Sequence, residues 1–308
     1  MKAIAVSDDG AFGFMDVSAP EPTEDKVIVR PAAVSINRGE VLRAKAFGAG
    51  FRPGWDFAGT VENTVRNGPE VGSRVAGYLH AAAWAEQIAV PPNMLADIPQ
   101  GVSFEQAAAL PVAGLTALGA VDSAGSLLGR KVLVTGASGG VGSFAANLAA
   151  LAGADVTAVV RRPAEGCSDL LRLADRVLSL RNGLAGAGDF GPYDLVVETL
   201  GGDSLTDALT MLGPTGRCVL LGVTDAPRTE IDAERFFMTG SAILQGYVLF
   251  RDRSGSAVTE RLSRLLHLVA RKGLPADVSL TAGWGDINRV ADRLIERSFV
   301  GKAVLSIG

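Results

Sequence analysis

Apolar residues in the middle of the chain form short continuous runs, and this pattern predicts an α/β domain built on a parallel sheet. Residues 132–134 and 155–160 are runs of this kind, as strands buried on both faces require. Between them, the Ala- and Leu-rich segment 143–151 is typical of a helix. A second helix is expected at 204–211, and further strands are expected at 176–179, 194–198, 216–221 and 241–249.

Short strand-like runs in residues 1–100 are separated by Pro, Gly, Asp and Asn, which predicts a compact β-rich domain or barrel. Residues 105–121 have a helical composition, but Pro111 and Gly114 are expected to bend or break that helix. The tail predicts helices at 254–272 and 284–297. The strands expected outside the middle of the chain are 2–6, 26–35, 57–65, 74–78, 84–90, 277–280 and 302–307.

A glycine-rich turn separates the strand at 131–135 from the helix that follows it. Gly136, Gly139, Gly140 and Gly142 let the backbone turn tightly and approach a ligand closely. A helix that begins at such a turn presents free N–H groups and the positive end of its dipole, where a pyrophosphate binds. Glycine-rich turns also occur for purely structural reasons. Because strand, turn, helix and second strand follow one another within one βαβ length, we interpret the segment as a dinucleotide-binding site.

The residues after the second strand bear on which dinucleotide is bound. NAD sites carry an Asp or Glu there, which accepts hydrogen bonds from the ribose hydroxyls. This strand instead leads into Arg161, Arg162 and Pro163, and no carboxylate occurs before Glu165. Two guanidinium groups can bind a 2′-phosphate, although solvated surface arginines are the alternative. We therefore expect NADPH as the cofactor.

The overall composition excludes several classes of function. At 308 residues the chain is long enough for two domains with separate cores. A net charge of −4 without a basic stripe argues against nucleic acid or an anionic membrane as a partner. No apolar run approaches the roughly 20 residues of a membrane span, and the N-terminus becomes acidic too early for a secretory signal. With only Cys167 and Cys218, no disulfide framework is expected, and the cytoplasm is the expected location.

Three specific motifs occur in order along the chain: PGWDFAG at 53–59, LPVAGLTA at 110–117 and GASGGVG at 136–142. They resemble the medium-chain dehydrogenase/reductase superfamily, in particular its zinc-free quinone oxidoreductase (zeta-crystallin-like) branch. The resemblance implies an α/β fold class, with a GroES-like β-rich domain beside a Rossmann domain with a doubly wound parallel sheet. The GroES-like domain is expected at 1–105, completed by 273–308. The NADPH-binding Rossmann domain is expected at 106–272, with the active cleft between the two.

The same resemblance argues against a metal. Zinc-dependent members place a Cys where this chain has Ser35-Ile36-Asn37, and a His-Glu pair where it has Trp55-Asp56. Catalytic zinc needs about three protein ligands and an open position. His80 and His267 lie outside these motifs. We therefore expect no metal site.

Without a Lewis acid, the substrate must already be electrophilic, as quinones and α,β-unsaturated carbonyls are. The protein then has to orient this small molecule and donate hydrogen bonds to the oxygen that collects charge. The resemblance suggests Asn37 as the catalytic polar group beside the nicotinamide, with Arg38 and Arg43 as candidate donors. The alternatives are that Asn37 caps a turn and that both arginines are solvated. Candidates for an apolar wall, or for the core, are Phe47, Phe51 and Trp55.

The resemblance also implies cofactor-binding roles for the residues that match the family's motifs. Val112 and Thr116 are expected to border the nicotinamide and the phosphates, and Lys302 to reach the cofactor or its neighbours. The pyrophosphate is expected in a cradle formed by Gly136, Ser138, Gly139, Gly140 and Val141, and the 2′-phosphate at Arg161 and Arg162. The nicotinamide ribose and the cleft are expected beside Thr199, Leu200, Gly201, Gly222, Val223 and Thr224.

The resemblance also implies a homodimer, formed through the strand at 241–249. Two features depart from the family: residues 44–52 contain no tyrosine, and residues 176–193 are too short and Gly-rich for the expected amphipathic helix. With no obvious general acid, solvent is a candidate proton source.

The main hypothesis is therefore an NADPH-dependent, zinc-independent reductase of quinones or α,β-unsaturated carbonyls. Two alternatives stay open. One is a pathway-specific enoyl or ketone reductase of a biosynthetic intermediate. The other is a non-catalytic NADPH-binding protein, which the missing tyrosine favours.

Overall fold

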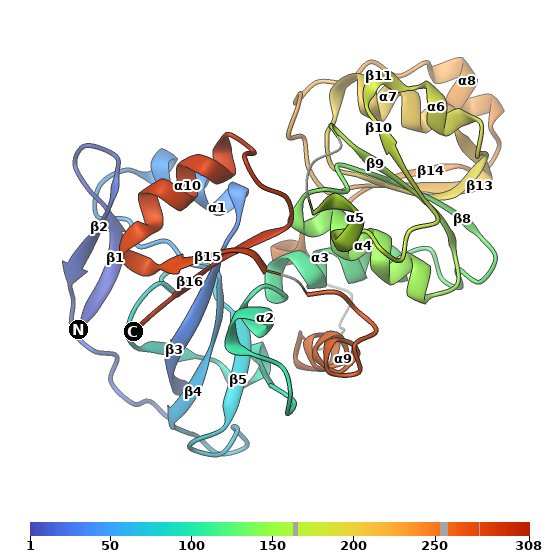
Figure 1. The fold of residues 1–308 in the computed structure, drawn as a ribbon. Coiled ribbons are helices and arrows are strands. Elements are labelled where there is room, and N and C mark those ends of the chain that lie inside the picture. The colour runs from blue at the N-terminus through green and yellow to red at the C-terminus, as the bar shows by residue number, and fades with distance from the viewer. Residues whose placement is uncertain (163–165, 253–257, 277) are drawn as a thin grey trace. The chain divides into compact units, whose positions relative to one another are not determined.

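The computed structural model describes residues 1–162, 166–252, 258–276 and 278–308, and the chain divides into two compact units. Unit 1 comprises Met1–Leu115 and Ser254–Gly308, and unit 2 comprises Thr116–Arg253. Each unit is built around its own sheet (Figure 1). Helix α9 (Val258–Ala270), expected in the nucleotide domain, belongs to unit 1, where it packs against β7 (Leu95–Asp97) and the short helix η1 (Pro92–Met94). The buried apolar residues of this helix are Leu262, Leu265, Leu266 and Val269.

Unit 1 contains a largely antiparallel sheet with the order β15-β16-β3-β4-β5-β7, in which β6 also pairs with β3. Among the strands described in this sheet, β15 and β16 alone pair in parallel. The last strand, β16, runs antiparallel to β3, and Ala303 faces Ile36 across this pair. The strands are β3 (Val27–Ile36), β4 (Asp56–Asn63), β5 (Arg74–Tyr78), β6 (Ile88–Val90), β15 (Val278–Gly283) and β16 (Lys302–Ser306), beside a hairpin of β1 (Lys2–Val6) and β2 (Phe12–Asp16).

The core of unit 1 explains one difference from the expected strands. Trp84 is fully buried and contacts Phe12 edge to face, with ring centroids 5.8 Å apart. The N–H of Ile4 donates to the Trp84 carbonyl at 2.8 Å. The segment predicted as a strand over 84–90 is thus a strand only at Ile88–Val90, because its first part passes through the core as an irregular connection.

Unit 2 contains a parallel sheet with the order β10-β9-β8-β12-β13-β14. Counted along the chain without β11, this is the order 3-2-1-4-5-6, the arrangement of dinucleotide-binding doubly wound sheets. The sheet strands are β8 (Lys131–Thr135), β9 (Asp155–Val160), β10 (Arg176–Ser179), β12 (Tyr193–Glu198), β13 (Leu212–Leu220) and β14 (Ile243–Gly246). Parallel strands end at the same edge, so the loops after β8, β9, β12 and β13 share one edge of unit 2.

The helices agree with the sequence pattern in the middle of the chain and differ from it near residues 38–47. Helix α1 (Arg38–Phe47) is absent from the helices that the sequence pattern predicts. The predicted helix at 105–121 is interrupted before Pro111 but not at Gly114, because the chain forms α2 (Phe104–Ala108) and then α3 (Pro111–Asp122). The remaining helices are α4 (Gly140–Leu151), α5 (Cys167–Leu170), α7 (Gly202–Thr210), α8 (Ala233–Met238), α10 (Ile287–Ile295), η2 (Leu249–Arg251) and η3 (Trp284–Asp286).

The connection between β10 and β12 is short, as the sequence predicts. It contains only β11 (Arg181–Leu184) and the four-residue helix α6 (Ala185–Gly188). The hydroxyl of Tyr193 donates to the carbonyl of Ala187 at 2.7 Å and so ties α6 to the start of β12. No described helix combines the length and the apolar composition that crossing a membrane requires.

Candidate functional site

The glycine-rich turn in unit 2 lies between β8 and α4. A Cβ atom on Gly142 would lie 2.5 Å from the carbonyl oxygen of Gly136, so the first turn of α4 packs directly on the backbone of the loop. The N-cap residue of α4 is Gly139, which has no side chain to accept a hydrogen bond from the helix. Because the first N–H groups of a helix lack partners within it, this 12-residue helix presents donors suited to a pyrophosphate.

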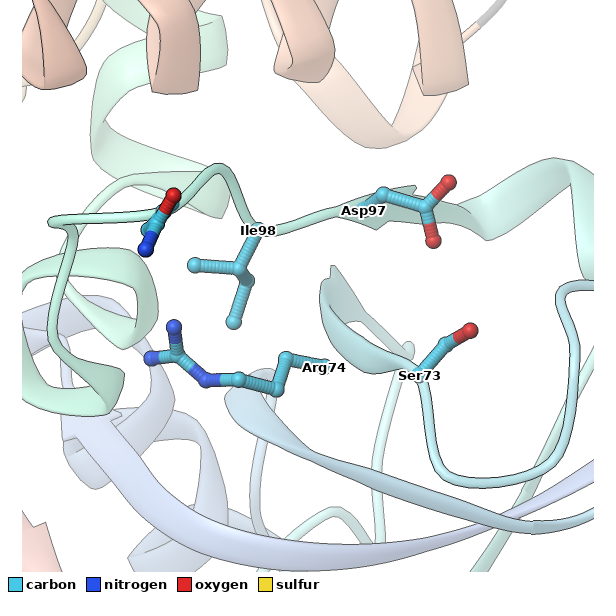
Figure 2. Close-up of a pocket in the computed structure, with 5 residues that line it drawn as sticks. Ser73, Arg74, Asp97 and Ile98 are labelled. Atoms are coloured by element: carbon cyan, nitrogen blue, oxygen red, sulfur yellow. The ribbon is translucent and has the colours of Figure 1, made fainter.

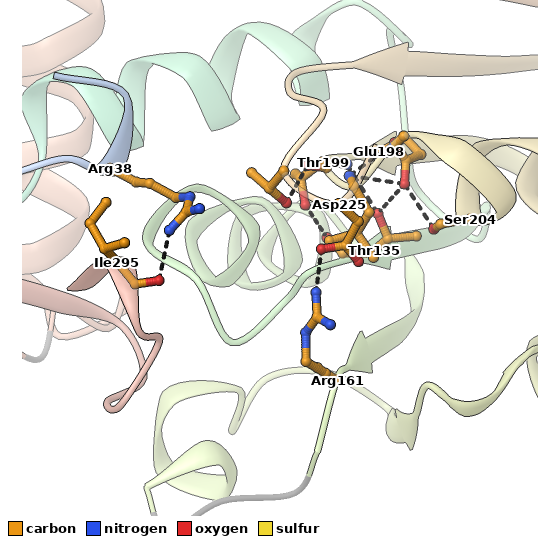
Figure 3. Close-up of polar contacts among 11 residues, drawn as sticks. Arg38, Thr135, Arg161, Glu198, Thr199, Ser204, Asp225 and Ile295 are labelled. Carbon is orange, nitrogen blue, oxygen red and sulfur yellow. Dashed lines mark hydrogen bonds and ion pairs between the residues drawn. The ribbon is translucent and has the colours of Figure 1, made fainter. Parts of the chain in front are cut away.

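Glu198 organises the loop that follows β12 (Figure 3). Its carboxylate is fully buried and accepts hydrogen bonds from the hydroxyls of Thr135 and Ser204, both at 2.9 Å. It also accepts the backbone N–H of Leu200 at 3.1 Å and that of Gly201 at 2.9 Å. This one side chain therefore links the end of β8, the loop after β12 and the start of α7.

The loops after β12 and β13 are joined at Thr199 and Thr224. Both the N–H and the hydroxyl of Thr224 donate to the carbonyl of Thr199, at 3.2 and 3.0 Å. The Thr199 hydroxyl donates in turn to the carbonyl of Thr135 at 3.0 Å. The structure thus brings most of the predicted cofactor-binding positions of unit 2 to one edge of the sheet. These positions are Gly136, Ser138, Gly139, Gly140, Val141, Thr199, Leu200, Gly201, Gly222, Val223 and Thr224.

Arg161 and Arg162 follow β9 at the same edge, and both are exposed. Arg161 forms an ion pair with Asp225, a residue that the sequence pattern did not single out (Figure 3). Pro163 and Glu165 lie outside the described residues. The carboxylate of Asp225 is therefore an anionic partner that the chain itself supplies to Arg161.

In unit 1, Asn37 belongs to a buried polar cluster formed with Glu40, Asp56 and Lys302. The side-chain amide of Asn37 donates to Asp56 at 2.8 Å and to Glu40 at 3.1 Å. Its carbonyl oxygen accepts a hydrogen bond from the ammonium group of Lys302 at 2.8 Å. The backbone N–H of Asn37 donates to the Glu40 carboxylate at 2.7 Å, so Asn37 is also the N-cap of α1.

Burial controls the protonation of this cluster. Burial, reinforced by the charge of Asp56, raises the pKa of Glu40 to about 8, although hydrogen bonds from Asn37 and the charge of Lys302 oppose the shift. Burial also raises the pKa of Asp56 and lowers the pKa of Lys302. With Glu40 protonated, the cluster is an Asp56–Lys302 ion pair of zero net charge, which is the state a buried site favours.

Val112 and Thr116 lie on α3. The N–H of Val112 donates to the Asp56 carboxylate at 2.8 Å, which connects the start of α3 to the polar cluster, and Thr116 is buried. Lys302, expected to reach the cofactor or its neighbours, is 5% exposed, and its ammonium group contacts Asn37 and Asp56.

The two arginines that the sequence offers as candidate donors make other contacts. Arg38 donates to the carbonyl of Ile295 at the end of α10, 2.9 Å away (Figure 3). Arg43 lies over the ring of Phe47 with its guanidinium carbon 5.2 Å from the ring centroid. Phe47 also stacks on Phe51, with centroids 4.6 Å apart, and is 58% exposed, so these rings form a surface platform.

The donor set around Asp56 does not fit a zinc ion. One carboxylate oxygen of Asp56 accepts from Val112, and the other lies near Asn37 and Lys302. A lysine ammonium 3.5 Å from that oxygen opposes a second cation there. Across the described ranges, no three His, Cys, Asp or Glu side chains gather closely enough to hold a metal ion.

A separate hollow of about 360 Å³ lies in unit 1 (Figure 2). Its lining residues are Ser73, Arg74, Asp97, Ile98 and Gln100, and none of them belongs to the polar cluster of Asn37 or contacts Glu198. Arg74 donates to the carbonyl of Val102 at 2.7 Å and lies over the ring of Phe104, so its charge has a structural partner.

Glu40, Glu198 and Asp225 are the candidate functional residues that the sequence pattern missed. The pair Asn37 and Glu40 has the spacing of a helix capping box, so that signal was present in the sequence. Glu198 is the last residue of a strand, but no local pattern shows that four donor groups converge on its carboxylate. Asp225 is 64 residues from its partner Arg161, a separation that local patterns do not bridge.

Known proteins resemble the chain over most of its length. A family model for zinc-binding dehydrogenases matches residues 140–270. The spectinabilin polyketide synthase system protein NorB of Streptomyces orinoci is 34% identical over 83% of this chain, which corresponds to 12% of the NorB chain. An acryloyl-coenzyme A reductase of Sulfurisphaera tokodaii is 28% identical over 99% of both chains. The chain spans about a tenth of the length of the first two curated relatives, which are polyketide synthase proteins.

Solved structures share the fold. A quinone oxidoreductase from Coxiella burnetii superposes with a TM-score of 0.83 at 24% identity, covering 100% of this chain and 99% of the other. A mycobacterial protein in complex with NADPH gives a TM-score of 0.86 at 24% identity, with 100% of both chains covered. At 24% identity these similarities show the fold of this chain, which combines a GroES-like domain with a Rossmann domain.

Proposed function

Because this chain belongs to the medium-chain dehydrogenase/reductase superfamily, we propose that it is an NADPH-dependent, zinc-independent reductase of quinones or α,β-unsaturated carbonyls. The observation that carries the proposal is in unit 2. An uncapped helix follows a glycine-rich turn at the edge of a sheet with dinucleotide-binding strand order. Arg161 and Arg162 stand where NAD sites carry a carboxylate.

The chain's own residues would hold the coenzyme as follows. The N-terminus of α4 binds the pyrophosphate through backbone N–H groups, and Glu198 keeps the loop at Thr199–Gly201 in shape beneath the ribose. Arg161 and Arg162 bind the 2′-phosphate. When bound, NADPH supplies the hydride that the acceptor receives.

In unit 1 we propose Asn37 as a positioning residue rather than a hydrogen-bond donor to the substrate. Its amide group donates to Glu40 and Asp56, and its carbonyl oxygen accepts from Lys302, so its polar atoms are already engaged. The stacked rings of Phe47, which is exposed, and Phe51, which is half-buried, are the candidate surface for a flat, conjugated substrate.

We propose that the final proton comes from solvent. The hydroxyl of Tyr193 donates to Ala187, and that of Tyr247 donates to Asp252 at 2.8 Å, so neither is poised as an acid. Residues 44–52 supply no hydroxyl group at all. An enolate or hydroquinone anion is basic enough to take a proton from water without a dedicated acid.

The alternative with most support is an enoyl reductase of a larger biosynthetic intermediate. One relative is named an acryloyl-coenzyme A reductase, and another belongs to a polyketide synthase system. An enoyl thioester is itself an α,β-unsaturated carbonyl, so this alternative narrows the main proposal and keeps its chemistry. A non-catalytic nucleotide-binding role is the second alternative.

The experiment that separates these functions measures NADPH consumption with three panels of acceptors: quinones, simple enones and enoyl thioesters. The proposal expects turnover with at least one panel, unchanged by a chelator. Turnover confined to enoyl thioesters would select the narrower function. NADPH binding without turnover of any acceptor would favour the non-catalytic role, and absence of NADPH binding would refute all three.

We further propose that the chain forms a homodimer through β14. This strand lies at the edge of the unit 2 sheet, and its apolar residues Ile243 and Leu244 are 42% and 36% exposed. An exposed apolar edge strand needs a partner to avoid unspecific association. Light scattering is expected to report a dimer, and a Leu244→Lys variant a monomer. A monomeric wild type would contradict the proposal.

A further inference from the structure

Arg161 and Asp225 form an ion pair in unit 2 although they follow strands that are not neighbours in the sheet. Arg161 comes directly after β9, and Asp225 lies in the segment after β13. Strands β8 and β12 lie between these two in the sheet order. Three strand spacings amount to about 14 Å. The arginine side chain and segment 221–225 together cover that distance (Figure 3).

The backbone fixes Asp225 near the end of β12. Its N–H donates to the carbonyl of Leu200 at 2.8 Å, and the N–H of Ala226 donates to the same oxygen at 3.2 Å. The neighbouring Thr224 is tied to Thr199. The carboxylate is therefore anchored over the end of β12, and Arg161 is the long side chain that reaches toward it.

The space between the two residues is the route of the proposed coenzyme. In a sheet of this order a dinucleotide lies outside the carboxyl ends of the strands, with its pyrophosphate at the helix after the first strand. Here that helix is α4, and the turn before it carries Gly136 and Gly139. An ion pair that reaches from the end of β9 to the end of β12 passes over the end of β8, and so crosses this route.

We propose that Asp225 is a specificity-determining residue, which holds Arg161 across the nucleotide site until a coenzyme displaces it. The inference rests on the proposed function. When NADPH binds, the Arg161 guanidinium exchanges one anionic partner for another, the carboxylate for the 2′-phosphate. NADH carries no such phosphate, so its binding breaks the ion pair without replacing it. The pair therefore weakens the binding of both coenzymes, and only NADPH recovers the loss.

The size of the effect follows from the exposure of the pair. The Arg161 and Asp225 side chains are 45% and 28% exposed, so solvent screens their attraction. Loss of a partly exposed ion pair of this kind changes an equilibrium constant by about two- to fivefold. An effect of this size can be measured directly as a change in coenzyme affinity.

The test is the calorimetric dissociation constant of NADPH and of NADH for the wild type, Asp225→Asn, Arg161→Ala and the double variant. Asp225→Asn is expected to bind both coenzymes about two- to fivefold more tightly. Arg161→Ala is expected to bind NADPH more weakly but NADH more tightly. Opposite changes from one substitution cannot arise from misfolding, which would weaken both. For NADH, the double variant is expected to gain no more than either single variant.

A matched control is Asp189→Asn, which removes one exposed carboxylate from the same unit at the end of α6. It is expected to leave both constants unchanged. Unchanged NADH affinity in both Arg161→Ala and Asp225→Asn would overturn the inference while leaving the proposed function intact. Equal gains in Asp189→Asn and Asp225→Asn would also overturn it, because a general charge effect would then explain the result. Failure of the wild type to bind either coenzyme would refute the proposed function itself.

Discussion

The ammonium group of Lys302 lies 3.5 Å from the carboxylate of Asp56, and both side chains are buried. They meet because β16, near the C-terminus, pairs with β3 and places residue 302 beside the end of that strand. Asn37 follows β3 directly and bridges the two charges with hydrogen bonds at 2.8 Å to each. The closing strand of the chain thus completes a polar cluster that begins in its N-terminal third.

Replacing Lys302 by Met should destabilise the protein strongly. The substitution leaves the buried Asp56 carboxylate without its cation, and breaking a buried pair costs about 3–5 kcal/mol. Urea unfolding followed by circular dichroism measures the loss. The control is Lys2→Met, which removes a shorter but exposed pair with Asp16 and should leave the unfolding midpoint nearly unchanged. Equal losses in the two variants would contradict the role of burial.

Glu40 should make stability fall as the pH rises from about 5 to 8. Burial raises its pKa to about 8 in the folded protein, above the usual value near 4.5. The folded state therefore binds the Glu40 proton more tightly than the unfolded state does. The resulting contribution to stability is fully present below pH 4.5 and is lost as the pH rises to about 8. One such group changes the free energy of unfolding by at most about 1.4 kcal/mol per pH unit.

The Glu40→Gln variant removes this titration. Its stability relative to the wild type is expected to improve as the pH rises over that window, measured by urea unfolding at several pH values. Glu105→Gln, at a half-buried position in the first turn of α2, serves as the control and should follow the wild type. A difference between Glu40→Gln and the wild type that does not vary with pH would count against the raised pKa.

Glu198→Gln should weaken both the fold of unit 2 and its affinity for nucleotide. The substitution replaces one carboxylate oxygen by an NH2 group, which faces N–H donors and cannot accept their hydrogen bonds. Leaving a buried donor unsatisfied costs about 1–3 kcal/mol. The melting temperature and the dissociation constant of NADPH are the measurements. Ser204→Ala removes only one hydroxyl donor to Glu198 and should have a smaller effect. If Glu198→Gln has the melting temperature and the NADPH affinity of the wild type, Glu198 has no role in the proposed site.

Gly142→Ala should destabilise unit 2 by about 1–3 kcal/mol through overpacking. The added methyl group would lie 2.5 Å from the carbonyl oxygen of Gly136 and 2.8 Å from the Cα atom of Ala137. Gly186→Ala, in α6, meets no atom within 4 Å and is the matched control, expected to be neutral. Thermal unfolding distinguishes the two. Similar melting temperatures for both variants would show that the turn tolerates the added volume.

Local sequence patterns predicted those helices, strands and turns whose formation depends on contiguous residues. The apolar run at 132–134, the glycine turn and the Ala-rich helix are contiguous, and the structure places β8 and α4 there. The short connection after β10 was also evident, because Gly-rich residues cannot form an amphipathic helix. By contrast, α1 was missed because its start is defined by the Asn37–Glu40 capping pair rather than by an apolar stripe.

The sequence by itself determined the βαβ unit and the absence of an acidic residue directly after β9, because each is a property of neighbouring residues. Only the tertiary structure decided that the polar atoms of Asn37 are already engaged and that Arg161 faces a carboxylate. Those contacts join residues separated by 265 and 64 positions. They depend on the pairing of β16 with β3 and on the order of strands in the parallel sheet. No local periodicity encodes such distances, because the order of strands is set by how whole apolar faces pack together.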